Sequence, residues 1–225
     1  MKLLGIETSG RVGSVALAVG TRIEAREIAT PREQTERLLP LVDELLGGAG
    51  VAVRDLDGIA FGRGPGSFTG LRIAAAVAQG LAAPANVPVL PVSSLLCLAQ
   101  RAWRTEAITR ALVCVDAHMG EVYWGEFEWR DGAVRAAGEE RLGSPAELAA
   151  LAGPPWVLVG DGFAAHGEVL APLLMTAAGE LPDLAAAAED LFPAAAEALA
   201  AGRAVQPRDA LPVYLREHTA WRRSS

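Results

Sequence analysis

Lysine is almost absent from this chain of 225 residues, because Lys2 is the only one. A phosphate-binding P-loop ends in a lysine, so no such loop can exist here, and Schiff-base chemistry is excluded everywhere except at Lys2. Positive charge is also scarce overall, with a net charge of −7 and a pI near 5.1. Proteins that bind nucleic acid unaided present a broad basic face. We therefore expect any contact with nucleic acid to depend on a partner.

Cysteines, histidines and long apolar runs are few. Cys97 and Cys114 lie in apolar stretches without C-x-x-C spacing, which predicts buried, reduced thiols and suits the cytosol. His118, His166 and His218 include no pair at i, i+4, so we expect no metal site. The apolar start of the chain is too short for a signal peptide, and no apolar run is long enough to span a bilayer. We expect a cytoplasmic protein without a membrane segment.

A glycine-rich segment, FGRGPGSFTG at residues 61–70, opens a long helix. Its glycines permit positive φ and close backbone approach, and Ser67 or Thr69 can cap the helix. A dinucleotide fingerprint would have glycine in place of Thr69, and a nucleophile elbow would have glycine in place of Pro65. We predict a structural turn and cap, with an anion site as the alternative. The residues of this loop are Gly64, Gly66, Ser67, Thr69 and Gly70.

The helix that follows has almost no polar side, since only Arg72 and Gln79 interrupt its apolar circumference. Such a helix needs cover on two sides. An amphipathic helix precedes it, begins with a capping box at Thr30–Glu33 and ends near Gly47. We predict that both helices leave apolar side chains exposed for a partner; the alternative is that both pack only on their own sheet. The predicted interface comprises Leu38, Leu41, Val42, Leu45, Arg72, Ile73, Ala76, Val77, Gly80 and Leu81.

The opening pattern of the chain is repeated in its second half. Residues 3–29 read as a three-stranded meander, and residues 112–135 repeat its plan, with an acidic residue, Glu7 or Asp116, ending each first strand. Alternating helices and strands follow each meander, which predicts an α/β fold with two lobes of like topology. We expect the two lobes to comprise residues 1–105 and 106–205, and the segment 206–225 to pack back on the first lobe. In the second half of the chain we expect helices at 146–153, 167–177 and 183–203, the last of them bent at Pro193.

Four polar residues are candidates for contact with a nucleotide. Glu7 and Asp116 end strands that would meet a cleft, Ser9 follows Glu7 in a partial phosphate-loop pattern, and Asp161 lies in a Gly-Asp-Gly segment after a strand. The same residues also suit ordinary turns, because Asp-Gly is a common turn pair. We favour the structural role for all four, and we assign no catalytic residue, no bound cofactor and no metal.

Four segments resemble the bacterial TsaB family, also called YeaZ. They are GRGPGSFTGLR, PREQTERLLP, DAHMGEVYWGEF and PVYLREHTAW, in the family's order, and the resemblance spans nearly the whole chain. The resemblance implies an actin-like (ASKHA) fold with two ribonuclease-H-like lobes, as in sugar kinases and the ATPase domain of heat-shock chaperones. That architecture agrees with the internal repeat.

The resemblance also implies a function. Family members are non-catalytic partner-binding subunits that pair with TsaD and work with TsaE in threonylcarbamoyl transfer to the adenosine beside the anticodon of tRNAs reading codons that begin with A. In isolation, family members form homodimers through the same helices. They contact tRNA only as part of the complex, and a nucleotide can bind in the assembled complex. Two alternatives are an ATP-dependent small-molecule kinase of the same fold and a peptidase. Arg216, Arg222 and Arg223 are candidates for tRNA contact, although a solvated tail is the simpler interpretation.

Overall fold

In the computed structural model, which describes residues 1–151, 153 and 155–216, the chain forms two compact units. The first lobe comprises Met1–Cys97 and Ala186–Val213, and the second comprises Leu98–Ala185 and, among the described residues of the tail, 214–216. Residues 186–205 therefore belong to the first lobe, whereas we expected them in the second. The reason is burial, because Leu191 and Phe192 pack in the same core as Leu3.

The closing segment divides at the same boundary. Residues 206–213 belong to the first lobe, where Val213 N donates a hydrogen bond of 2.8 Å to Arg63 O. Tyr214 and the described residues after it belong to the second lobe, so the expected return of 206–225 to the first lobe holds only up to Val213.

The first lobe contains a five-stranded sheet in the order β3-β2-β1-β4-β5. The predicted meander is confirmed, since β1 is antiparallel to β2 and β2 to β3, while β4 and β5 run parallel to β1. Alternate residues of β1 face opposite sides, so Leu4 and Ile6 enter one core and Leu3 the other. The strands are β1 (Lys2–Glu7), β2 (Gly13–Val19), β3 (Arg22–Ile28), β4 (Gly58–Gly64) and β5 (Val89–Ser93).

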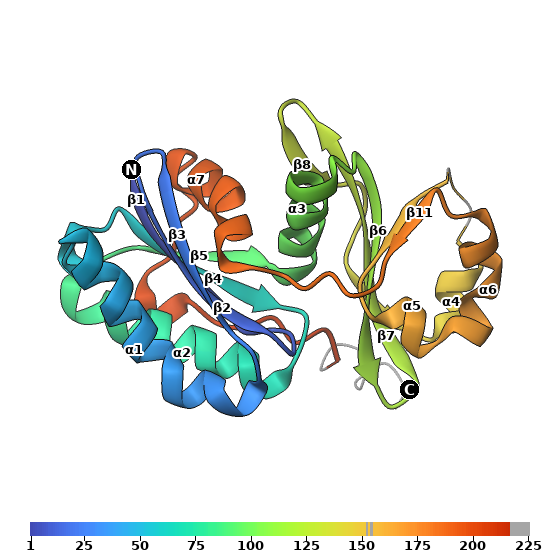
Figure 1. The fold of residues 1–225 in the computed structure, drawn as a ribbon, viewed down its shortest axis with the longest axis horizontal. Helices are drawn as coiled ribbons and strands as arrows, with labels where there is room; N and C mark the ends of the chain where they lie inside the picture. The colour runs from blue at the N-terminus through green and yellow to red at the C-terminus, as the bar shows by residue number, and fades with distance from the viewer. Residues whose placement is uncertain (152, 154, 217–225) are drawn as a thin grey trace. The chain divides into compact units, whose positions relative to one another are not determined.

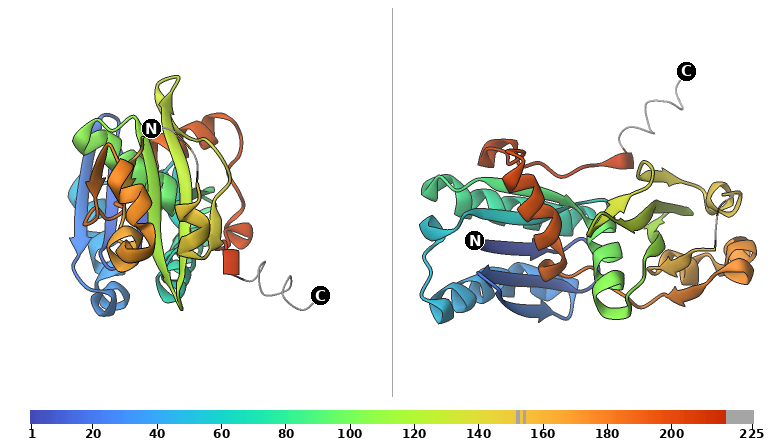
Figure 2. Two further views of the ribbon diagram at one scale, coloured as in Figure 1. Left: turned by 90° about the vertical axis from the view of Figure 1, so that its right-hand side faces the viewer. Right: turned by 90° about the horizontal axis from the view of Figure 1, so that it is seen from above.

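Helices cover both faces of this sheet. Figure 1 shows α1 (Pro31–Ala49) and α2 (Phe68–Ala85) together on one side, and α7 (Phe192–Ala200) on the other. Figure 2 shows α7 lying across the strands in its right-hand view. The Thr30 cap of α1 is confirmed, because the Thr30 hydroxyl accepts from Glu33 N at 3.4 Å. The Glu33 carboxylate bonds to the Thr30 hydroxyl, at 3.1 Å, where a full capping box would have it accept from the Thr30 backbone N–H. Short helical turns complete the lobe at η1 (Val53–Asp55), η2 (Ala188–Leu191) and η3 (Pro207–Asp209), and α3 (Ser94–Glu106) leads into the second lobe.

The second lobe repeats the topology of the first. Its sheet has the order β8-β7-β6-β10-β11, in which β6, β7 and β8 form an antiparallel meander and β10 and β11 run parallel to β6; β9 also pairs with β7. Two lobes of this ribonuclease-H-like topology give the chain its actin-like fold. The strands are β6 (Arg110–His118), β7 (Glu121–Arg130), β8 (Ala133–Ala136), β9 (Arg141–Gly143), β10 (Val157–Val159) and β11 (Gly179–Leu181).

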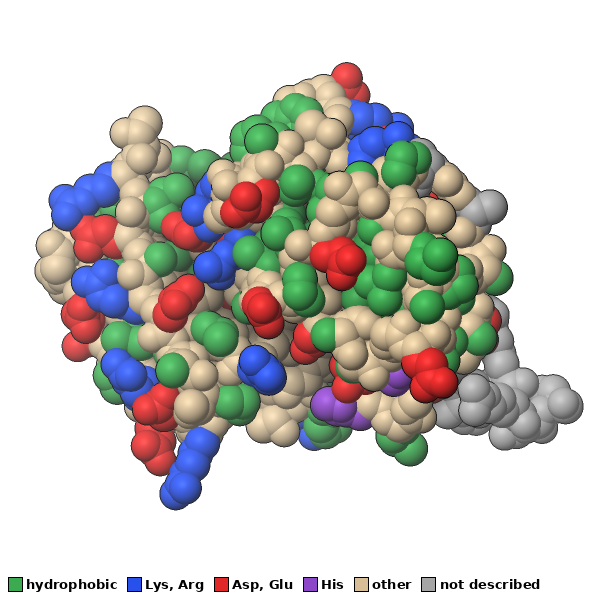
Figure 3. Space-filling view, turned by 45° about the vertical axis from the view of Figure 1, so that its right-hand side comes forward, with side chains coloured by type: hydrophobic (Ala, Val, Ile, Leu, Met, Phe, Trp, Pro, Cys, Tyr) green, Lys and Arg blue, Asp and Glu red, His purple; other side chains and the backbone are tan. Residues whose placement is uncertain are grey.

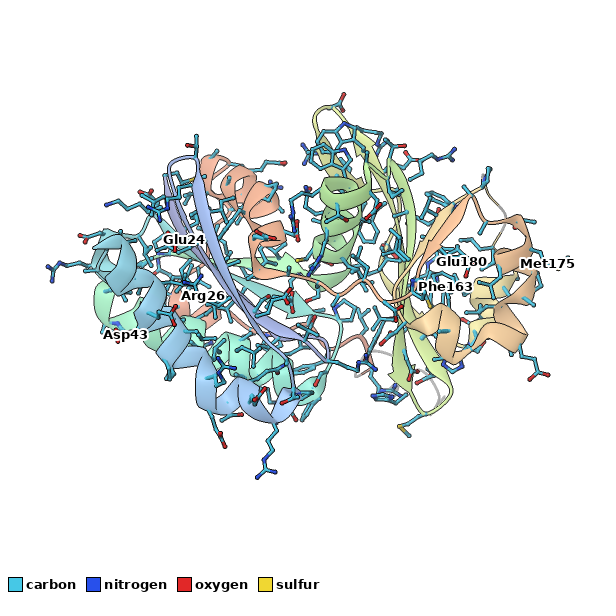
Figure 4. All side chains as sticks on the ribbon, viewed as in Figure 1. Glu24, Arg26, Asp43, Phe163, Met175 and Glu180 are labelled. Atoms are coloured by element: carbon cyan, nitrogen blue, oxygen red, sulfur yellow. The ribbon has the colours of Figure 1, made fainter. Side chains whose placement is uncertain are left out.

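Three short helices accompany this sheet: α4 (Pro145–Ala149), α5 (Gly162–Ala165) and α6 (Gly167–Thr176). Phe163 of α5 points into the core that the sheet and helices share, whereas Met175 of α6 points away from it (Figure 4). Cys114 lies in this core and Cys97 in the first lobe, and both are buried thiols outside any disulfide, as predicted. Burial also raises the pKa of the Cys114 thiol.

Two helices are shorter than the sequence predicts. Alanine content predicts one helix over 183–203, but α7 begins only at Phe192, after the separate turn η2. Pro193 stands in the first turn of α7, where its fixed φ and missing N–H suit a helix start rather than a bend. Likewise α4 ends at Ala149, short of residue 153. Within the described residues, no helix combines the length and apolar character needed to cross a membrane.

Candidate functional site

The apolar face of α1 is turned inward. Leu38, Leu41, Val42 and Leu45 are buried and pack in the same core as Ile6 of the sheet. The prediction that these four side chains remain exposed for a partner is therefore wrong. The opposite face of α1 is exposed and mostly polar, with residues such as Arg37 and Glu44, although Leu39 is also exposed there. The sheet and α2 together cover the apolar face of α1.

The outer face of α2 is different. Arg72, Ala76 and Gly80 are exposed, and Ile73, Val77 and Leu81 are half-buried against the core of the first lobe. Phe68 at the start of the helix is 53% exposed, and the Arg72 guanidinium lies 3.7 Å from the centre of its ring. We call these seven residues the α2 surface. Because Ala76 and Gly80 carry almost no side chain, a second helix can approach this surface closely.

The glycine-rich loop before α2 is closed on itself. Ser67 caps the helix by accepting from Gly70 N at 3.3 Å, and Ser67 N donates to Ser9 O at 2.7 Å. The Thr8 hydroxyl donates to Gly70 O at 2.7 Å, which holds the loop against the end of β1. The predicted cap is confirmed, and Ser67 provides it. The N–H groups of Ser67 and Gly70 already donate within the chain, so these two are not available to an anion.

Glu7 is fully buried beneath this loop. Its Oε1 accepts from Ser9 N at 2.6 Å, and its Oε2 accepts from the Ser94 hydroxyl at 3.1 Å. Ser94 Oγ in turn accepts from Gly64 N at 3.3 Å, so one carboxyl links the ends of β1, β4 and β5. Burial raises the pKa of Glu7 above its usual range, although these hydrogen bonds act to lower it. The site suits a structural carboxyl better than a ligand for a solvated cation.

Replacing Glu7 with glutamine tests this role. A raised folded-state pKa means that stability is fully present below the unfolded pKa and is lost as the pH rises through the folded pKa. Glutamine imitates the protonated form, so the melting temperature of Glu7→Gln should exceed that of the wild type at pH 8 and match it near pH 4, at about the ordinary pKa of glutamate. Glu7→Leu, the control, loses both hydrogen bonds and should be destabilised throughout by about 1–3 kcal/mol. If the melting temperature of Glu7→Gln differs from that of the wild type by the same amount at every pH, the structural role of the Glu7 carboxyl is contradicted.

Asp116, at the end of β6, is the centre of a polar cluster in the second lobe. Its Oδ2 lies 3.0 Å from His118 Nδ1, and its Oδ1 lies 3.1 Å from His166 Nε2. Asp116 Oδ1 also accepts from His118 N at 3.0 Å, while Asp116 N donates to Asp161 Oδ1 at 3.1 Å. Figure 3 shows histidine side chains at the surface beside acidic ones. The cluster ties the β6–β7 turn to the segment that follows β10.

The charge of Asp116 is stabilised by this arrangement. Burial acts to raise the pKa of Asp116, but the hydrogen bonds from His166 and His118 outweigh it, and the pKa is lowered overall. Asp161 is exposed, and Gly160 before it has φ of 104° and packs against the backbone of Cys114. The Gly-Asp-Gly segment is thus a tight turn against β6, which is sufficient reason for its composition.

Replacing Asp116 with asparagine should destabilise the protein near neutral pH. Because the folded-state pKa is lowered, the carboxylate contributes stability above its unfolded pKa and loses it as the pH falls through the folded pKa. We expect a loss of about 1–3 kcal/mol at pH 7, from hydrogen bonds to a charged group. Urea titrations should show the difference from the wild type narrowing below about pH 4. His118→Gln, the control, leaves the contact between His166 and Asp116 in place, so its loss of stability should be smaller. Equal losses of stability in both variants at every pH would refute the role assigned to the Asp116 charge.

Sequence reasoning missed this cluster. His118 is the last residue of β6, with φ of 59°, and His166, between α5 and α6, is half-buried against Asp116. The two histidines are far apart in the chain, so spacing held no signal of their meeting. Among the described residues, no three His, Cys, Asp or Glu side chains are placed to hold a metal ion. His218 lies outside those residues.

The tail arginines are described only in part. Arg216 forms an ion pair with Glu121, and its Nη2 donates to Ala117 O at 2.8 Å, so it fastens the β6–β7 hairpin instead of extending into solvent. Arg222 and Arg223 lie outside the described residues. Glu7 and Ser9 belong to the first lobe, and Asp116 and Asp161 to the second.

Comparison with known proteins gives a consistent result. A family model described as TsaD: tRNA N6-adenosine threonylcarbamoyltransferase matches residues 27–206. The tRNA threonylcarbamoyladenosine biosynthesis protein TsaB of Escherichia coli is 39% identical, with 99% of this chain and 98% of that protein covered. The protein of the same name from Haemophilus influenzae is 33% identical, with 99% and 97% covered. The solved structure of YeaZ from Pseudomonas aeruginosa superposes with a TM-score of 0.87 and 42% identity over 95% of this chain and 99% of that one.

Proposed function

The chain belongs to the TsaB (YeaZ) family of tRNA threonylcarbamoyladenosine biosynthesis proteins, and on that premise we propose that it is a non-catalytic subunit that docks onto TsaD. In that role it acts with TsaD and TsaE in threonylcarbamoyl transfer to the adenosine beside the anticodon of tRNAs reading codons that begin with A. In the absence of TsaD it forms a homodimer through the same surface. Its place of action is the cytoplasm.

The observation that carries this proposal is the α2 surface. It combines exposed small residues with half-buried aliphatic ones, so a partner helix can pack closely and remove apolar area from water. The four residues of α1 that were predicted for the interface do not contribute to it, because Leu38, Leu41, Val42 and Leu45 are buried in the protein's own core. Of the ten residues predicted for the interface, we retain the six on α2: Arg72, Ile73, Ala76, Val77, Gly80 and Leu81.

The internal use of the loop groups supports a non-catalytic role. In kinases of this fold the loop after the first strand wraps phosphates, but here the Thr8 hydroxyl and the Ser9 carbonyl are bonded to the glycine-rich loop. The buried Glu7 carboxyl is occupied by Ser9 and Ser94. We therefore rank the ATP-dependent kinase below the docking subunit. The net charge of −7 likewise favours contact with tRNA through the complex only.

A reconstituted reaction tests the proposal. The purified chain is mixed with TsaD and TsaE of the same organism, tRNA, ATP and an activated threonylcarbamoyl donor, and threonylcarbamoyladenosine in tRNA is measured with each protein omitted in turn. We expect a stable complex with TsaD, product only when TsaD is present, and no product from this chain alone. Product formation by the chain alone, or failure to bind TsaD in calorimetry, would refute the docking role. Calorimetry of the chain alone with ATP and Mg²⁺ addresses the kinase alternative, and we expect no saturable heat.

A further inference from the structure

Three Asp-Gly pairs occur in the chain, at residues 57–58, 131–132 and 161–162. In such a pair the backbone nitrogen of glycine can attack the aspartyl side chain, because glycine has no Cβ to obstruct the approach. The attack needs a carboxyl that can turn toward the next N–H and a backbone that can follow it. The three pairs differ in both respects.

The pair at 57–58 is held by its surroundings. Asp57 Oδ2 accepts a hydrogen bond from Lys2 N at 2.6 Å. Gly58 is buried in the sheet of the first lobe, where a Cβ atom would lie 2.7 Å from Leu90 Cδ1. Both the carboxyl and the backbone of this pair are therefore restrained.

The pair at 161–162 is held in the same way. Asp161 Oδ1 accepts a hydrogen bond from Asp116 N at 3.1 Å. Gly162 begins α5 and is buried, and a Cβ atom on it would lie 2.5 Å from Cys114 Sγ. Cyclisation at this pair would first require the hydrogen bond to break and the segment to leave β6.

The pair at 131–132 has neither restraint. Asp131 and Gly132 are exposed and form the two-residue turn between β7 and β8, with φ of 53° and 79°. Among the described residues, none forms a hydrogen bond or ion pair with the Asp131 carboxyl. A Cβ atom on Gly132 would meet no described residue within 4 Å, its two chain neighbours aside. The Asp131 carboxyl can therefore turn toward Gly132 N.

We propose that Asp131 is a modification site, at which the side chain cyclises onto Gly132 N and the resulting succinimide reopens to isoaspartate. Gly132 N forms a bond to Asp131 Cγ, while the carboxyl hydroxyl and the amide proton leave together as water. A water molecule then adds to the main-chain carbonyl carbon of Asp131 and breaks its bond to nitrogen, so that the chain continues through Cγ. The product has the mass of the original chain, and the reaction needs no oxidant, reductant or cofactor.

Isoaspartate alters the hairpin that this turn closes. The Cβ atom of residue 131 becomes part of the main chain, so the turn gains one backbone atom. The pair Arg130–Ala133 closes the ladder of β7 and β8 directly beside the turn. A two-residue turn fixes the register of its strands, so the longer turn separates this pair and loosens β8.

Prolonged incubation of the full, folded chain near neutral pH tests the proposal. Isoaspartate is located by peptide mapping with fragmentation that distinguishes it from aspartate, and is counted with an isoaspartyl methyltransferase and labelled S-adenosylmethionine. We expect about tenfold more isoaspartate at 131 than at 57 or 161, because a hydrogen bond must break and the chain must open locally at the other two pairs. Asp131→Glu, which keeps the charge, should give none at this position, since the attack would have to close a six-membered ring.

The same incubation in urea separates the effect of the fold from that of the sequence. The three pairs should then react at similar rates, because nothing holds any of them in the unfolded chain. Equal amounts at 131 and at either other pair in the folded chain would overturn the proposal, as would the same preference for 131 in urea. In folded chains carrying isoaspartate at 131, amide hydrogen exchange of residues 133–136 should be about tenfold faster, and unchanged exchange would overturn the effect on the hairpin.

Discussion

Arginine in place of Ala76 is expected to weaken binding to TsaD at least 100-fold without unfolding the protein. Ala76 is exposed on the outer face of α2, so the new side chain extends into solvent in the lone chain. In a docked complex the same side chain would keep the two helices apart and place a charge in an apolar contact. A 100-fold loss corresponds to about 2.7 kcal/mol, and titration calorimetry with TsaD measures it directly.

A matched control variant separates the effect of the position on α2 from the effect of the added charge. Ala164 of α5 is also exposed, and Ala164→Arg adds the same charge on the second lobe. We expect Ala164→Arg to bind TsaD as the wild type does, and both variants to melt at the wild-type temperature. Normal TsaD affinity in Ala76→Arg would refute the α2 surface as the docking site. Sedimentation of the same variants measures homodimer formation. A variant that no longer forms the homodimer but still binds TsaD would refute the use of one surface for both.

Alanine in place of Gly70 should have the largest effect on folding. A Cβ atom on Gly70 would overlap the carbonyl oxygen of Thr8, which belongs to the backbone and cannot move away as a side chain does. Two hydrogen bonds hold this contact in place. The Thr8 hydroxyl donates to Gly70 O at 2.7 Å, and Ser67 N donates to Ser9 O at 2.7 Å. We expect a loss of roughly 3 kcal/mol or more, a large part of the 5–15 kcal/mol that stabilises a typical domain.

Urea unfolding followed by circular dichroism measures this loss. Gly48→Ala is the control, because Gly48 lies in α1 and a Cβ there meets nothing within 4 Å. Alanine is the better helix former, so Gly48→Ala should gain up to about 1 kcal/mol. If Gly70→Ala unfolds at the same urea concentration as the wild type, the clamp between the glycine-rich loop and the end of β1 does not exist as described.

The predictions that held rest on local patterns. The meander of residues 3–29 follows from aliphatic runs separated by turn residues, and the Thr30 and Ser67 caps follow from side chains that bond within three residues. Such interactions are complete within a few residues, so the sequence alone contains the information. The repeat at 112–135 extends the same reasoning, because both halves use one plan.

The predictions that failed concern which surface of the protein packs against which other surface. Periodicity identifies the apolar face of α1 but not what covers it, and the structure buries that face on the protein's own sheet. Alanine-rich composition favours helix throughout 183–203, yet burial of Leu191 and Phe192 in the first lobe outweighs that weak preference and begins the helix later.

The sequence by itself determined the element types, their caps, the duplicated α/β plan and the family to which the chain belongs. Only the tertiary structure decided that α1 buries its predicted interface residues while α2 leaves aliphatic side chains half-buried, that Glu7 is a buried link between strands, and that Asp116 meets two histidines. The physical reason is that helix and turn signals act over a few residues, whereas burial and charge pairing depend on which segments the folded sheets bring together.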